Sequence, residues 1–95
     1  MIEIMTFRLK GDVDEPAFLE ADESFRTSFL YLQPGLRRAT TARADDGEWV
    51  LVLLWSGAEA AEAASHAAQA DPVAQAFLDL VDRDSATRRR YTLLD

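Results

Sequence analysis

The chain has 95 residues, of which 48% are hydrophobic, carries a formal net charge of −7 and contains no cysteine. This length predicts one domain over residues 1–95 with a modest core. The acidic balance argues against nucleic acid and membrane surfaces, which bind clustered lysine and arginine, and the lack of cysteine excludes disulfides and thiolate sites. The first residues lack the pattern of a secretory signal, and the longest apolar run, residues 49–55, is too short to cross a bilayer. We therefore expect a cytoplasmic protein that binds neither nucleic acid nor membrane.

The first part of the chain predicts a strand followed by an amphipathic helix. Residues 2–10 read as a strand that is apolar on both sides, and Asp14 can cap a helix whose first turn holds Pro16. The helix should stop at residues 33–35, Gln-Pro-Gly, because proline cannot continue a helix and glycine accepts the left-handed exit. Apolar residues recur on one side of this helix at spacings of three and four. They are Phe18, Ala21, Phe25, Phe29 and Leu32.

A hairpin is predicted next. Residues 36–44 form a more polar strand, residues 45–47 (Asp-Asp-Gly) form a turn, and residues 48–55 form a strand that is again apolar on both sides. Directly after it, Ser56 and Glu59 have the spacing of a capping box, which predicts the start of a second helix.

The last part of the chain predicts a broken helix and a final strand. The second helix is rich in alanine and should run to Ala70, where Asp71-Pro72 interrupts it and starts a short helix. Residues 82–85 are predicted as a loop and residues 86–94 as a strand rich in arginine.

The order of elements is β-α-β-β-α-β, which predicts an α+β, ferredoxin-like fold with a four-stranded antiparallel sheet. Right-handed crossovers put the two doubly apolar strands, residues 2–10 and 48–55, at the centre of the sheet and the arginine-bearing strands at its edges. The helices cover one face only. The other face would be a large apolar patch in water, so we expect it to pack against a second copy of the chain.

With the elements in this order, five features carry a resemblance to a known family. They are Gln-Pro-Gly at 33–35, the turn with Gly47, the strand ending at Trp55, Ser56 with an acidic, alanine-rich helix behind it, and His66 ahead of the Asp71-Pro72 break. The chain resembles the dimeric α/β-barrel superfamily and, within it, the antibiotic biosynthesis monooxygenases. The resemblance implies a homodimer with its sheets face to face and a pocket between each sheet and its helices. Members that are enzymes oxidise small aromatic or quinol-like substrates without metal or flavin, and other members bind or degrade haem.

Three residues are predicted as catalytic on this resemblance. Trp55 matches the family's tryptophan at the end of the third strand, where its indole N–H could hold a substrate oxygen, although the more ordinary interpretation is a core aromatic stacked under the helices. His66 is the only histidine and could move a proton near neutrality, but it shares a helical stripe with Glu59 and Glu62, as a solvated histidine would. Tyr91 could donate its phenolic proton to a bound oxyanion, or it could be a packed aromatic.

Further residues are predicted to bind substrate. Thr6 could offer a hydroxyl from the first strand, although threonine is common in ordinary strands. Arg38, Arg89 and their neighbours could fix an acidic or phenolate substrate, or they could be solvated charges of the edge strands or partners of carboxylates across the dimer. The aromatic walls of the pocket are predicted to be Phe25, Phe29 and Trp49. With one histidine and no convergent carboxylates, no metal site and no cofactor are expected.

Three functions remain open on the sequence. The leading hypothesis is a cofactor-independent monooxygenase that acts on a small aromatic or quinol-like substrate. The second is a non-catalytic homodimer of the same fold that binds a small apolar ligand or has a structural role. Haem binding through His66 ranks last, because haem degraders resemble one another in carrying an asparagine on the first strand and this chain contains no asparagine.

Overall fold

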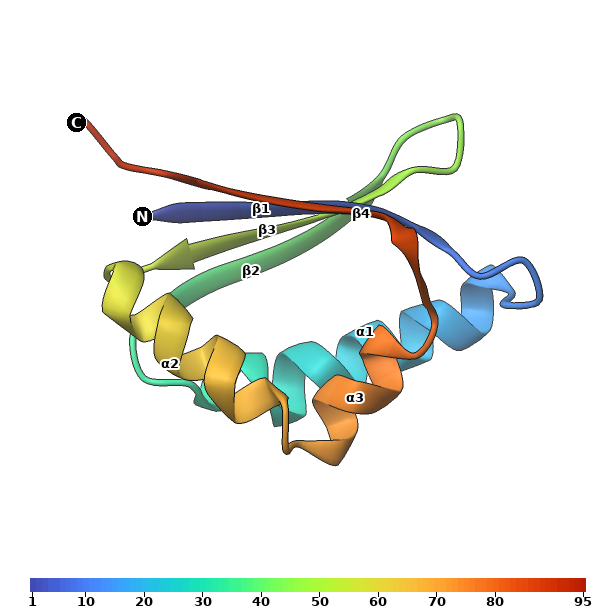
Figure 1. The fold of residues 1–95 in the computed structure, drawn as a ribbon, viewed down its shortest axis with the longest axis horizontal. Helices are drawn as coiled ribbons and strands as arrows, with labels where there is room; N and C mark the ends of the chain where they lie inside the picture. Colours follow the sequence, from blue (N-terminus) through green and yellow to red (C-terminus); the bar gives the residue numbers. More distant parts are fainter.

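A computed structural model describes all 95 residues as one layer of strands and one layer of helices (Figure 1). In chain order the elements are β1 (Ile2–Leu9), α1 (Glu15–Ser28), the 3-10 helix η1 (Leu30–Leu32), β2 (Leu36–Arg43), β3 (Trp49–Trp55), α2 (Ala58–Ala68), α3 (Pro72–Leu78) and β4 (Val81–Tyr91). None of the helices is long and apolar enough to span a membrane.

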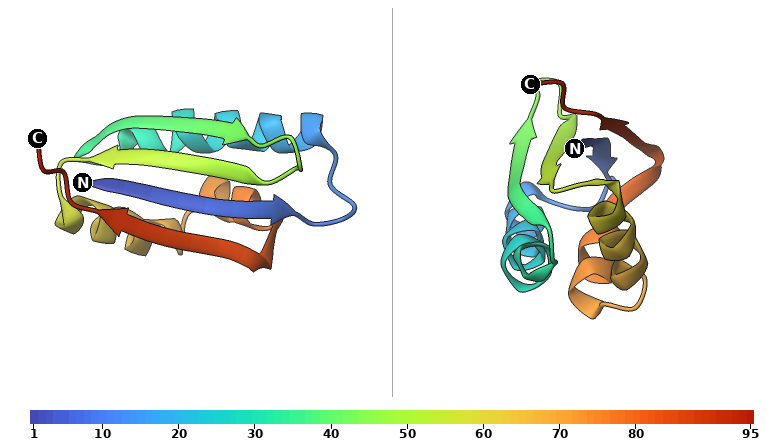
Figure 2. Two further views of the ribbon diagram at one scale, coloured as in Figure 1. Left: turned by 90° about the horizontal axis from the view of Figure 1, so that it is seen from above. Right: turned by 90° about the vertical axis from the view of Figure 1, so that its left-hand side faces the viewer.

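The four strands form one antiparallel sheet in the order β2-β3-β1-β4. Figure 2 shows this order from above and shows all helices gathered beneath the same face of the sheet. The predicted α+β, ferredoxin-like fold is therefore confirmed, with the two doubly apolar strands at the centre and the arginine-bearing strands at the edges.

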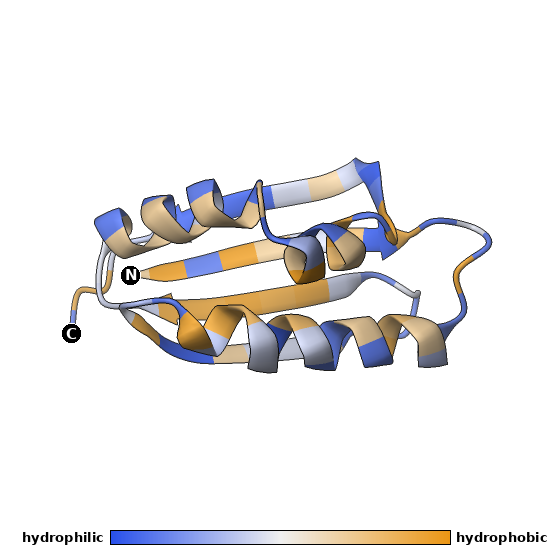
Figure 3. Cartoon of the chain, turned by 90° about the horizontal axis from the view of Figure 1, so that it is seen from below, coloured by the Kyte–Doolittle hydropathy of each residue, from blue (hydrophilic) through white to orange (hydrophobic).

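The core lies between the sheet and the helices, because every second residue of the central strands points down to them. Figure 3 shows β3 as a continuous apolar band between the helices. Phe77 of α3 stacks on Phe25 with ring centroids 4.5 Å apart and lies 5.4 Å from Phe18. Each such buried ring contributes about 1.5–3 kcal/mol. The buried side of β3 consists of Trp49, Leu51, Leu53 and Trp55.

One buried carboxylate fixes α1 against the sheet. Asp22 is only 1% exposed, and its two oxygens accept hydrogen bonds from Thr41 Oγ1 of β2 at 2.8 Å and from Arg26 Nε at 3.0 Å. Both oxygens of the carboxylate therefore have hydrogen-bond donors, which offsets the cost of burying the charge.

The helix boundaries differ from the prediction at two places. The α-helix ends at Ser28 and continues as η1, so Leu32 falls off the core face and is 70% exposed. The predicted capping box is wrong: Gly57 is the N-cap of α2, and no side chain caps it. Asp14 and Asp71 do cap α1 and α3, each accepting a hydrogen bond from a backbone amide three residues on.

The final strand starts earlier than predicted. β4 begins at Val81 and includes residues 82–85, which the sequence indicated as a loop. A register shift lies in the pairing with β1 between Thr6 and Arg8, and Ser85 bridges it. Its hydroxyl accepts a hydrogen bond from the Arg8 backbone N–H at 2.8 Å and donates one to the Asp82 carbonyl at 2.6 Å. A side chain thus replaces the backbone partner that the irregularity removes.

Candidate functional site

A cavity of about 230 Å³ lies between the inner face of the sheet and the helices. Its presence follows from the composition of α2, which buries only Ala61 and Ala64 and so leaves space above the sheet that larger side chains would fill. Eleven of its sixteen lining residues are hydrophobic. The large apolar ones are Met5, Phe25, Phe29, Leu30, Leu53, Trp55, Phe77 and Leu78, and the polar ones are Glu3, Ser65, Gln69, Gln75 and Arg88.

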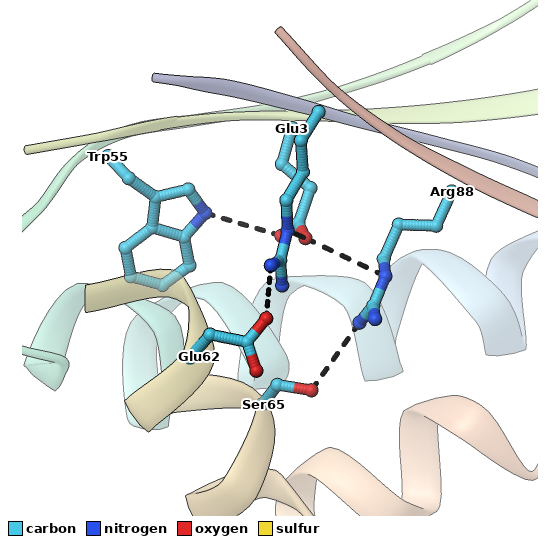
Figure 4. A network of polar contacts seen from close by, with 6 residues as sticks. Glu3, Trp55, Glu62, Ser65 and Arg88 are labelled. Carbon is cyan, nitrogen blue, oxygen red and sulfur yellow. Dashed lines mark hydrogen bonds and ion pairs between the residues drawn. The ribbon is translucent and has the colours of Figure 1, made fainter. Parts of the chain in front are cut away.

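A carboxylate is buried at the wall of this cavity. Glu3 of β1 is 4% exposed, because it shares the inward phase of the strand with Met5 and Phe7. Its Oε1 accepts a hydrogen bond from the Trp55 indole Nε1 at 3.3 Å, and its Oε2 accepts one from Arg90 Nε at 2.9 Å (Figure 4). The tryptophan and the glutamate come from neighbouring central strands, so the pairing of β1 with β3 places them side by side.

Two arginines of β4 and one glutamate of α2 complete the polar cluster. Arg88 Nε lies 3.8 Å from Glu3 Oε2, and Arg88 Nη1 donates to Ser65 Oγ at 3.4 Å. Arg90 also donates from Nη1 to Glu62. This bond with Arg90 lowers the pKa of the exposed Glu62 carboxyl, and the bonds with Glu62 and then Glu3 raise the pKa of Arg90. The Nη2 of Arg90 is buried and has no protein partner.

The arrangement combines an apolar chamber with a nearly neutral set of charges. Two carboxylates face two guanidiniums, so their formal charges sum to zero. If the carboxylate of Glu3 took up a proton, the cluster would become net positive beside the cavity. A site of this kind can accept a proton from a bound molecule and stabilise the anion that remains.

Three of the residues predicted from the sequence line the cavity. Trp55, Phe25 and Phe29 all contribute to its walls. Trp49 is buried as well, but at the far end of the core, where its ring lies 4.6 Å from that of Phe18 and does not reach the cavity.

The other predicted residues are not brought to the cavity. Thr6, Arg38 and Tyr91 lie on the opposite face of the sheet, where Thr6 bonds to Thr87 on β4. They pair in register with outward-facing residues of the central strands, and successive strand residues alternate between faces. His66 is exposed on α2 and is not among the lining residues. The structure therefore does not join these four side chains to Trp55 within one pocket.

The charged members of the site were predicted only in part. Arg88 and Arg90 were considered only as neighbours of Arg89 on an edge strand, and Glu3 was not considered at all. One signal was present in the sequence. Glu3, Met5 and Phe7 occupy alternate positions of the strand and so point to the same face, which means that the pattern that buries Met5 and Phe7 also buries the carboxylate. A buried carboxylate on a central strand requires a partner, and the arginine-rich strand beside it was the natural source.

Solved structures of other proteins resemble this chain over nearly its whole length. SnoaB, a cofactor-independent oxygenase from Streptomyces nogalater, is 23% identical with a TM-score of 0.71, covering 99% of this chain and 92% of that one. A candidate antibiotic biosynthesis monooxygenase from Nitrosomonas europaea is 18% identical with a TM-score of 0.75, covering 99% and 98%. The protein At3g17210 from Arabidopsis thaliana is 12% identical with a TM-score of 0.76, covering 99% and 95%.

These likenesses establish the fold. The chain has the ferredoxin-like fold that these proteins share. No family model and no curated protein sequence matches it. The resemblance to antibiotic biosynthesis monooxygenases that the sequence indicated is thus confirmed at the level of three-dimensional structure.

Proposed function

We propose that this protein is a cofactor-independent monooxygenase that oxidises a small phenol or quinol in the cavity between sheet and helices. One observation carries the proposal: the buried carboxylate of Glu3 borders an apolar cavity and is hydrogen-bonded to the indole of Trp55. The structural likeness to SnoaB, a cofactor-independent oxygenase, supports the same reading.

The size of the cavity limits the substrate. A cavity of roughly 150 Å³ lined by aliphatic and aromatic residues holds benzene, and this one is about 230 Å³. A molecule of one or two aromatic rings therefore fits. Phe25, Phe29 and Phe77 offer ring faces and edges against which such a molecule can pack.

The chemistry needs one base and a place for negative charge. The carboxylate of Glu3 takes the proton of the substrate hydroxyl, and the Trp55 N–H can then hold the phenolate oxygen. The electron-rich ring reacts with O₂; one oxygen atom ends on the ring carbon and the other leaves as water. For 1-naphthol the balance is one naphthol and one O₂ giving one 1,4-naphthoquinone and one water, so the substrate supplies all the reducing electrons.

The charged cluster favours that proton transfer. Once Glu3 is neutral, Arg88 and Arg90 face only Glu62, and the surplus positive charge stabilises the phenolate inside a site of low polarity. The apolar walls also keep water from the reacting carbanion.

Oxygen uptake with 1-naphthol tests the proposal. Glu3→Gln keeps the size of the side chain but removes the base, so the rate should fall at least about 100-fold. Trp55→Phe should lower the rate as well. Arg89→Gln is the control, because it removes a charge on the opposite face of the sheet and should leave the rate unchanged. Equal rates in all three variants and the original protein would refute the assignment. His66→Ala and Tyr91→Phe belong in the same series, since a large loss in either would move the proton transfer away from Glu3.

A binding protein without catalysis is the second candidate. Both oxygens of Glu3 already accept hydrogen bonds, so the cluster could serve only to hold the helices over the sheet. In that case 1-naphthol should bind while oxygen is not consumed.

The assembly proposed with this function is a homodimer joined through the open sheet faces. The open face of the central strands carries Ile2, Ile4, Val50, Val52 and Leu54, none of which is fully buried in the single chain. A contiguous apolar sheet face of this kind commonly marks an interface, and a second copy presents the same surface in return. A native mass spectrum reports the subunit count and any molecule retained in the cavity; a monomer at micromolar concentration would refute the dimer.

A further inference from the structure

One cation at the cavity is largely free to bind a ligand. Arg88 lines the cavity, and its side chain is half exposed. A guanidinium carries five N–H donors, yet this one makes a single long hydrogen bond, to Ser65 at 3.4 Å, and lies 3.8 Å from the Glu3 carboxylate. Arg90, in contrast, is engaged by both Glu3 and Glu62.

A second hollow adjoins the cavity. This hollow, of about 430 Å³, shares Gln69, Gln75 and Leu78 with the cavity, so these three side chains form the boundary between them. Its only charged lining residue is Arg83, whose nearest carboxylate, on Asp79, is 4.0 Å away. Apart from Glu3, the charged residues that line the two spaces are therefore arginines.

We infer that Arg88 is a specificity-determining residue that binds a carboxylate on the aromatic substrate, so that the substrate class is an aromatic hydroxy acid. The inference rests on the proposed function. The hydroxyl end of the molecule lies at Glu3 and Trp55, and the carboxylate lies at the half-exposed guanidinium of Arg88. There a planar carboxylate can take paired N–H bonds from the guanidinium. Arg83 adds a second positive charge to the adjoining hollow.

Binding measurements test this directly. Titration calorimetry without oxygen compares 1-naphthol with 5-hydroxy-1-naphthoate, whose carboxylate lies on the ring opposite the hydroxyl. The original protein should bind the naphthoate at least about tenfold more tightly, as expected for a hydrogen bond to a charged group. Arg88→Gln should abolish this preference, so that the variant binds the two ligands with affinities within about twofold of each other.

Arg89→Gln is the matched control, because it removes the same charge one residue away on the opposite face of the sheet. It should keep the preference. Arg88→Lys keeps the charge but not the paired geometry, so it should retain an intermediate preference and serves if Arg88→Gln does not fold. Equal affinities for the two ligands in the original protein, or equal losses in the Arg88 and Arg89 variants, would overturn the inference.

The two proposals fail in different ways. A preference for the naphthoate that depends on Arg88, without oxygen consumption by either compound, would support the role of Arg88 and refute the monooxygenase. Oxidation of 1-naphthol without any preference for the carboxylate would refute the role of Arg88 alone.

Discussion

The Arg90–Glu3 pair gives the sharpest stability prediction. Arg90→Met keeps an unbranched apolar stem but leaves the 4% exposed Glu3 with only Trp55 at 3.3 Å and Arg88 at 3.8 Å. Breaking a buried pair costs about 3–5 kcal/mol. Because the Arg90 side chain is 26% exposed and Arg88 can partly replace it, we expect a loss of about 2–3 kcal/mol in the free energy of unfolding. For a chain of this length that corresponds to a fall of roughly 10–20 °C in Tm.

Urea unfolding followed by circular dichroism measures the effect, with all variants at the same protein concentration because a dimer would make the transition depend on it. Arg89→Met is the control: Arg89 lies on the open face over the Tyr91 ring at 5.3 Å, a contact worth about 0.5–1 kcal/mol. Equal losses in the two variants would refute the reasoning. The double variant Glu3→Gln with Arg90→Met should be more stable than Arg90→Met alone, since it no longer buries an unpaired charge.

Three other perturbations have defined outcomes. Gly35→Ala should cost about 2–4 kcal/mol in urea unfolding, because φ is +87° and the new Cβ would lie 2.5 Å from Ser56 Oγ; Gly11→Ala, which meets nothing within 4 Å, should stay within about 0.5 kcal/mol. Glu62→Gln should remove a stabilising contribution that is present above the ordinary pKa of 4.5 and lost as pH falls through the lower folded value, so in unfolding titrations the original protein and the variant should converge in acid. Val52→Asp on the open face should convert the proposed dimer to a monomer in native mass spectra, and an unchanged dimer would move the interface elsewhere.

The architecture was predictable because the sheet imposes a strong pattern. Only the two central strands, β1 and β3, are largely apolar on both of their faces, whereas all strand arginines except Arg8 lie on the edge strands. A central strand is covered by helices on one face and requires a partner on the other. Apolar residues therefore occur at nearly every position along it, and this pattern is visible in the sequence.

Local boundaries were not predictable from the same pattern. Residues 82–85 are polar and contain two aspartates, which is typical of a loop, yet they belong to β4, where Asp82 pairs with Arg8 of β1. The pairing depends on Ser85, whose hydroxyl bonds to the backbone of Arg8 on a strand 77 residues earlier. The composition of a short segment does not reveal a contact between residues so far apart in the sequence. The end of α1 was missed for a related reason, since the chain tightens into η1 before Pro34 is reached.

Which arginines join the charged part of the site depends on the register of β4 against β1. The sequence alone does not determine this register. Arginines fill three successive positions of β4, so either phase of the strand would send at least one of them toward the helices. A slip of one residue would turn Arg89 inward and carry Arg88 and Arg90 to the open face. Glu3 and Glu62 would then share one cation in place of two. Since the cost of leaving a buried carboxylate poorly paired exceeds what the open face gains from two solvated arginines, charge balance favours the register in which Glu3 lies opposite Arg90.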